Sequence, residues 1–219
     1  MLLFAAGLFL AGCAESVVPN SYIMTADSQR DAVRPASAAD GPIVYIAPVR
    51  LPEYLNHDGI VTRDHGNEIR RAEAHVWAGP LSDEIARAMS ENLSALLPTD
   101  RTTLAESGGQ IPVDYAVAIE IVTFELNSGT NMVDMVARWV LFRGEEKRLL
   151  TMRRSEFHKQ VAGADYRDTV ATMSEAVAAL SDDIATAISQ SRDRRKSDRW
   201  AARRAPGPSS GEATARRTR

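Results

Sequence analysis

The sequence is poor in cysteine, which stabilises small secreted domains through disulfides, and in aromatic residues, which form ligand-binding cages. Its 219 residues include a single cysteine, Cys13, and only 6% aromatic side chains. A single cysteine excludes an internal disulfide framework. The three tryptophans are scattered along the chain, which is unlike a stacked aromatic cage. The apolar run Leu2–Leu10 is also far shorter than the about 20 residues that a membrane-spanning helix needs.

Motifs of catalysis and nucleotide binding are missing as well. The sequence has no Gly-x-Ser-x-Gly, no phosphate-binding glycine-rich loop and no dinucleotide fingerprint. None of the four histidines has the spacing of a zinc motif. His57-Asp58 and Asp64-His65 offer groups for a metal or acid–base site. They lie in a polar stretch where solvated side chains are the default, so we predict no enzyme activity and no metal site.

The most informative feature that is present is Leu10-Ala11-Gly12-Cys13, directly after the apolar run. Small residues before a cysteine at this place are typical of a bacterial lipoprotein signal. We therefore expect residues 1–12 to be a signal peptide, and Cys13 to carry covalent diacylglycerol and N-acyl lipid. Secretory signals open with positive charge, whereas nothing basic precedes Arg30, so we expect the leader to begin upstream of Met1.

The residue after the cysteine bears on the membrane that receives the anchor. Ala14 stands where an Asp is usually linked to inner-membrane retention, which favours the periplasmic face of the outer membrane. At about 0.8 kcal/mol per buried methylene, more than one acyl chain gives a stable anchor. No further cofactor is expected.

The net charge of −3 hides an acidic body and a basic tail. Residues 192–219 carry ten basic and three acidic side chains and almost nothing apolar. They cannot bury enough surface to offset their ordering entropy, which predicts a disordered tail. The tail is either solvated without a partner or touches anionic lipid headgroups, at about 1 kcal/mol per basic residue. Nucleic acid, the usual partner of such segments, is not expected for an exported protein.

Hydrophobic periodicity divides the chain between the signal and the tail into strands and two helices. Within the lipidated N-terminus, residues 13–41, Tyr22–Met24 is a short strand candidate. In the domain proper, residues 42–191, Ile43–Val49 predicts a central strand and Asn67–Trp77 a second one. A helix is expected over residues 81–97, started by Pro80, with one apolar stripe: Leu81, Ile85, Met89, Leu93 and Leu96.

The second half of the domain predicts a meander followed by a helix. Strands are expected over Tyr115–Leu126, Val133–Leu141 and Arg148–Gln160, joined by short turns. In the first of them, alternation places Val117, Ile119 and Ile121 on one face and Ala116, Ala118, Val122 and Phe124 on the other. A helix follows from Asp165 to about Gln190. The prediction is an α+β two-layer sandwich, an antiparallel sheet with both amphipathic helices packed on one face.

Three segments resemble a known family. They are Leu51-Pro52-Glu53-Tyr54-Leu55 with Gly59–Arg63, His75–Leu81, and Glu91–Leu93 with Leu97–Arg101. The chain is similar over about residues 22–190 to the ABC-transport auxiliary lipoproteins of the PqiC type. It departs from them at Gly79, where family members commonly carry Glu.

The resemblance implies a non-catalytic outer-membrane lipoprotein that supports membrane integrity. Its partners would be a PqiB-like MCE-domain protein, whose periplasmic tube it docks to the outer membrane, and inner-membrane transporter components. A ring-shaped homo-oligomer is also implied. Two alternatives stay open: an auxiliary subunit of an ATP-driven MCE transporter, and a stand-alone periplasmic carrier that binds lipid between its helices and its sheet.

The segment Leu51–Arg63 is the candidate contact with a partner. Its Pro, Asn, Asp and Gly content predicts an irregular loop. Such a loop either exposes its apolar groups to a partner or folds onto its own core. The candidate partner-binding residues are Tyr54, Leu55, Ile60, Val61 and Arg63.

Overall fold

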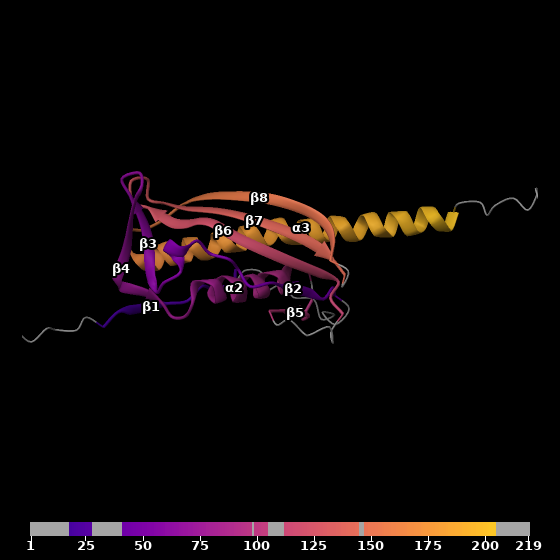
Figure 1. The fold of residues 1–219 in the computed structure, drawn as a ribbon, viewed down its shortest axis with the longest axis horizontal. Helices are drawn as coiled ribbons and strands as arrows, with labels where there is room; N and C mark the ends of the chain where they lie inside the picture. Colours follow the sequence, from indigo (N-terminus) through magenta and orange to yellow (C-terminus); the bar gives the residue numbers. More distant parts are fainter. Residues whose placement is uncertain (1–17, 28–40, 98, 105–111, 145–146, 205–219) are drawn as a thin grey trace, which may run out of the picture.

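The structure is a computed structural model that describes residues 18–27, 41–97, 99–104, 112–144 and 147–204 (Figure 1). The expected signal peptide and Cys13 lie outside the described residues. The described chain forms one eight-stranded mixed sheet, a 3-10 helix (η1) and two long helices. In chain order these are β1 (Asn20–Tyr22), β2 (Val44–Ile46), η1 (Glu53–Leu55), β3 (Gly59–Asp64), β4 (Glu68–Trp77), α2 (Leu81–Leu96), β5 (Thr102–Thr103), β6 (Tyr115–Asn127), β7 (Met132–Arg143), β8 (Arg148–Gln160) and α3 (Tyr166–Arg204).

The sheet is built around β6. Strands β7 and β8 follow it as an antiparallel meander, which confirms that part of the prediction. The other edge of β6 is shared: β2 pairs with its start and β3 with its end, both in parallel. The predicted α+β class is confirmed, but the sheet is mixed and not antiparallel throughout. The chain passes through α2 before it reaches β6, and such a crossover lets strands join in parallel.

The segment between β2 and β4 is more ordered than its composition predicts. Instead of an irregular loop over Leu51–Arg63, the chain forms η1 and then β3, which pairs antiparallel with β4. Gly59 is needed at the start of β3, because a Cβ there would lie 2.6 Å from the carbonyl oxygen of Ala72. The Gly that suggested a loop is thus a point of close approach between two strands.

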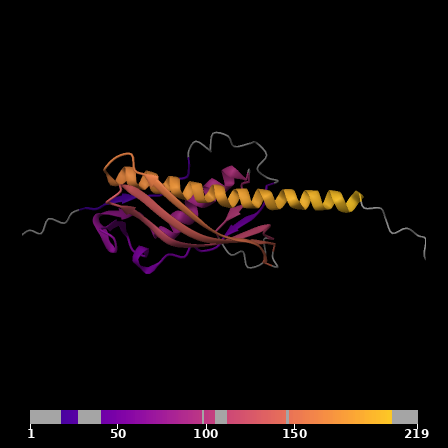
Figure 2. The same cartoon turned by 90° about the horizontal axis from the view of Figure 1, so that it is seen from above.

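Both helices cover one face of the sheet and bury the apolar stripes that the sequence predicts (Figure 2). The alternation of β6 differs from the prediction in one respect. A β-bulge between Ile121 and Thr123 adds one residue to the strand. Phe124 consequently joins Val117 and Ile121 on the helix side, where it is fully buried.

Helix α3 is longer than predicted. It was expected to end near Gln190, with a disordered tail from residue 192, yet it continues to Arg204. Residues 192–204 extend past the end of the sheet (Figures 1 and 2). Extending a helix that is already nucleated costs little, and Arg, Lys and Ala are good helix formers. The prediction of disorder is thus wrong for residues 192–204, and residues 205–219 lie outside the described residues.

Candidate functional site

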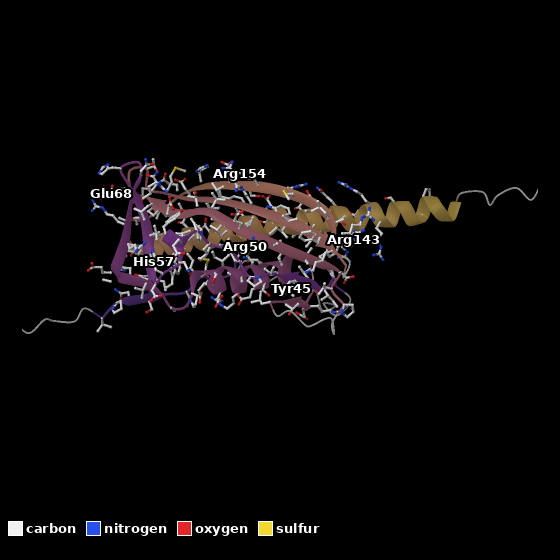
Figure 3. The ribbon with its side chains drawn as sticks, viewed as in Figure 1. Tyr45, Arg50, His57, Glu68, Arg143 and Arg154 are labelled. Atoms are coloured by element: carbon white, nitrogen blue, oxygen red, sulfur yellow. The ribbon has the colours of Figure 1, made fainter. Side chains whose placement is uncertain are left out.

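The sheet face opposite the helices, here called the outer face, is largely uncovered. It holds a hollow of about 460 Å³. We call this the outer hollow; its lining is Arg50, Ala118, Ile119, Glu120, Arg138, Val140, Met152, Arg153 and Arg154. Arg50 and Arg154 are labelled in Figure 3. The side chain of Met152 is 70% exposed, which is unusual for a residue of its size and polarity.

The outer hollow combines an apolar floor with a charged rim. Ala118, Val140 and Met152 come from three neighbouring strands, β6, β7 and β8. On the rim, Arg138 Nη1 lies 3.9 Å from Glu120 Oε2. Arg50 is held at the edge of β6 by its backbone, since its N–H donates to the Ile119 carbonyl at 3.0 Å. Methionine adapts to different shapes and arginine is enriched in protein interfaces, so the hollow suits an amphipathic partner.

Three of the predicted partner-binding residues are core residues. Leu55 is 1% exposed, Ile60 is fully buried and Val61 is 3% exposed. Of the two alternatives for this segment, the structure therefore shows the one in which it folds onto its own core. The expectation that these three side chains face a partner is wrong, because η1 and β3 place them in the buried apolar core cluster.

The other two predicted residues, Tyr54 and Arg63, meet at a buried carboxylate. The Tyr54 hydroxyl donates to Glu125 Oε2 at 2.6 Å, and the Arg63 guanidinium forms an ion pair with Glu125 Oε1. Glu125 is only 1% exposed. Burial, and then the hydrogen bond to Glu125, raise the pKa of Tyr54. We call these three residues the Glu125 cluster.

The Glu125 cluster positions the segment between Arg50 and β3. It joins η1 and β3 to β6 along the stretch of β6 that neither β2 nor β3 pairs with. A buried carboxylate is costly unless it is paired and hydrogen-bonded, so the two contacts fix this segment on the outer face. Sequence reasoning missed Glu125. The available signal was a charged residue between Phe124 and Leu126 in an apolar strand.

Two of the remaining polar candidates, Asp64 and His65, lie at the turn between β3 and β4. Asp64 accepts a hydrogen bond from Ser128 Oγ at 2.9 Å and pairs with Arg70 at 3.0 Å. The Ser128 hydrogen bond is the main cause that lowers the pKa of Asp64. The side chain of His65 is 84% exposed. Among the described residues, no group of three or more His, Cys, Asp or Glu side chains is placed to hold a metal ion.

His75, on β4, contacts two tyrosine side chains. Its Nδ1 lies 2.8 Å from the Tyr22 hydroxyl. Its ring stacks on Tyr166 with 4.0 Å between the ring centroids. These contacts join β1, β4 and the start of α3 at one end of the molecule.

The fold is an α+β domain in which two helices cover one face of a mixed sheet and the other face holds an open hollow. Residues 22–185 match the family of ABC-type transport auxiliary lipoprotein components. The chain belongs to this family, a non-catalytic one, which agrees with the prediction of no enzyme activity. Within the described ranges, no helix has both the length and the apolar character needed to cross a membrane.

Two curated relatives show the same partial similarity. The intermembrane transport lipoproteins PqiC of Escherichia coli (strain K12) and Shigella flexneri are each 28% identical over 97 residues. That match covers 44% of this chain and 51% of each relative, so the chain spans about half the length of the curated relatives it matches.

Two solved structures share the fold. An uncharacterized protein superposes with a TM-score of 0.64 at 18% identity, covering 78% of this chain and 99% of that one. A protein from Xanthomonas campestris superposes with a TM-score of 0.60 at 15% identity, covering 82% and 98%. At these identities the likeness concerns the fold alone.

Proposed function

We propose that the protein is an outer-membrane lipoprotein subunit of an MCE-type intermembrane lipid-transport system. In this role it docks the periplasmic MCE tube to the outer membrane and supports membrane integrity. The observation that carries the proposal is the family match over residues 22–185. The name of the PqiC relatives, intermembrane transport lipoprotein, supports it.

The arrangement of the chain supports an anchored adaptor. Strand β1 lies at one end of the long axis and the C-terminal end of α3 at the other (Figure 1). Cys13 precedes Asn20 by seven residues, which span at most about 25 Å when fully extended. An acylated Cys13 would therefore hold the β1 end near the membrane and point the far end of α3 away from it.

The outer hollow is the surface that we assign to the MCE partner. It is uncovered, its floor is apolar and its rim is rich in arginine. The carrier alternative needs space for lipid between the helices and the sheet. Phe124, Met135 and Trp139 fill that layer and are fully buried, which argues against a lipid groove at these residues.

Two variants of the full chain test the proposal. Cys13→Ser should leave the domain folded but absent from outer-membrane fractions. Met152→Glu places a charge in the floor of the outer hollow and should weaken binding of the purified MCE-domain partner at least tenfold, measured by biolayer interferometry. Ile23→Glu is the matched control, because it adds the same charge at an exposed apolar residue that lies outside the hollow.

Three outcomes would each contradict one part of the proposal. If no MCE-domain protein binds the acylated wild-type chain, the adaptor role fails. If Met152→Glu binds like the wild type, the adaptor role stands but the outer hollow is not the docking surface. An outer-membrane location of Cys13→Ser would contradict the anchor.

A further inference from the structure

We propose that a second pocket, where α3 leaves the sheet, binds a phosphate-bearing anion. The pocket has a volume of about 610 Å³. Strand β7, strand β8 and helix α3 all contribute to it. We call it the arginine pocket, after the five arginines that line it: Arg143, Arg148, Arg153, Arg194 and Arg195. Arg143 is labelled in Figure 3.

Among the described residues, the lining of the arginine pocket carries a net positive charge. Its twelve lining residues include no Asp or Glu. Within the described part of the chain, none of the five arginines forms an ion pair. The outer hollow differs, because Glu120 lies in its lining and Arg154 pairs with Glu156. Like charges gathered in one hollow repel each other, and an anion that binds among them relieves this repulsion.

The pocket is partly preorganised. Arg143 Nη2 donates to the Ser191 carbonyl at 3.0 Å and also to Ser191 Oγ. Its guanidinium lies 5.7 Å from the centroid of the Tyr115 ring. The guanidinium of Arg153 lies 5.8 Å from the Trp139 ring centroid. These contacts hold two arginines in place before a ligand arrives, which lowers the entropy that binding costs.

The chemistry of the lining indicates the ligand. Guanidinium groups present planar pairs of donors that match phosphate oxygens, and Thr151 and Gln190 add neutral donors. Leu149, on the same pocket, is 56% exposed. An exposed leucine beside a cluster of arginines suits a phosphate group that carries an apolar body, as in a phospholipid headgroup. Free phosphate shares the same recognition chemistry.

The inference is independent of the MCE partnership, and calorimetry on the acylated full chain in detergent tests it. The ligands are dihexanoyl phosphatidic acid, inorganic phosphate and dihexanoylglycerol, which lacks phosphate. We expect the phosphatidic acid to bind and dihexanoylglycerol not to bind. If inorganic phosphate binds as tightly as phosphatidic acid, the ligand is free phosphate. If inorganic phosphate binds at least tenfold more weakly, the ligand is a lipid headgroup.

A triple variant locates the binding. Arg148→Gln, Arg194→Gln and Arg195→Gln change exposed side chains, so the fold should persist, and affinity should fall at least tenfold. The control variant removes the same charge from the outer hollow by Arg50→Gln, Arg138→Gln and Arg154→Gln. Its affinity for phosphatidic acid should lie within twofold of that of the wild type. Replacing Arg148, Arg194 and Arg195 by Lys keeps the positive charge but removes the planar donors. The affinity of this variant for phosphatidic acid should therefore lie between those of the wild type and the triple Gln variant.

Three results would overturn the inference. The first is equal affinity of the wild type and the triple Gln variant for phosphatidic acid. The second is binding of dihexanoylglycerol as tight as that of phosphatidic acid. The third is a hexaglutamate peptide that binds the pocket more tightly than either phosphate ligand, which would assign it to an acidic protein segment instead.

Discussion

The two faces of the sheet are held by different chemistry. On the helix face, fully buried apolar side chains from the sheet and both helices interlock, among them Phe124, Trp139 and Ile184. On the outer face, one segment is fixed by the Glu125 cluster, and the outer hollow beside it is open. The helix face therefore supplies stability, and the outer face keeps surface available for a partner.

Each face also contains a partly buried chain of hydrogen-bonded polar side chains, and the two chains differ in charge. On the helix face, Trp139 Nε1 donates to Ser155 Oγ at 3.1 Å, and Ser155 donates to Asp183 at 2.6 Å. This chain links β7, β8 and α3 around an aromatic ring. On the outer face, the chain centres on a carboxylate and a guanidinium. Losing apolar volume should damage the first face most, and losing a charge should damage the second.

The largest loss of unfolding free energy is expected from Trp139→Ala. Truncating a buried aromatic side chain costs about 3–5 kcal/mol of unfolding free energy, because a cavity remains. Here the substitution also removes the hydrogen-bond donor to Ser155. Urea denaturation followed by circular dichroism measures the change. Trp200→Ala is the control, since Trp200 is 59% exposed; a similar loss in both variants would contradict the dominance of the helix face.

On the outer face, Arg63→Ala should lower the unfolding free energy by about 2–3 kcal/mol, because it leaves the buried Glu125 carboxylate without its counter-ion. The matched control is Arg70→Ala. Arg70 pairs with Asp64 and Glu68 at the surface, and exposed pairs contribute about 0–1 kcal/mol. The same denaturation experiment compares them. Equal losses would show that the Glu125 cluster is no more important than a surface ion pair.

A smaller loss of unfolding free energy is expected from Tyr54→Phe. This substitution removes one hydrogen bond to Glu125 and keeps the aromatic ring. One buried hydrogen bond contributes about 1–1.5 kcal/mol. Because the pKa of Tyr54 is raised in the fold, its contribution is present below the usual tyrosine pKa and is lost as the pH rises through the higher folded value. The pKa of Tyr166 is also raised, by burial, so phenolate absorbance at 295 nm should show one fewer late-ionising tyrosine in the variant than in the wild type.

The two faces also differ in how far the sequence predicts them. The periodic spacing of apolar residues was sufficient for α2, the start of α3 and the meander, because a single buried face imposes that spacing. Phe124 was assigned to the wrong face because a bulge shifts the alternation by one residue, and no residue type marks the bulge.

The candidate site was predicted less well than the fold. Tyr54 and Arg63 were selected with Leu55, Ile60 and Val61 as one exposed loop, although only the first two contact a charged group. Their partner Glu125 lies more than sixty residues away in sequence, and no local pattern indicates such a pairing. The outer hollow and the arginine pocket likewise collect residues from separate strands, so they become visible only once the strand register is known.

The smallest effect concerns Asp64, at the turn where the outer-face segment meets β4. Its pKa is lowered by the hydrogen bond from Ser128 and by the charges of His65 and Arg70. A lowered folded pKa stabilises the fold above the usual Asp value near 3.9, and this contribution disappears as the pH falls through the folded value. Asp64→Asn should therefore lower the unfolding free energy slightly at pH 7 and by less at pH 2. A difference between wild type and variant that is the same at both pH values would assign the role of Asp64 to hydrogen-bond geometry instead of charge.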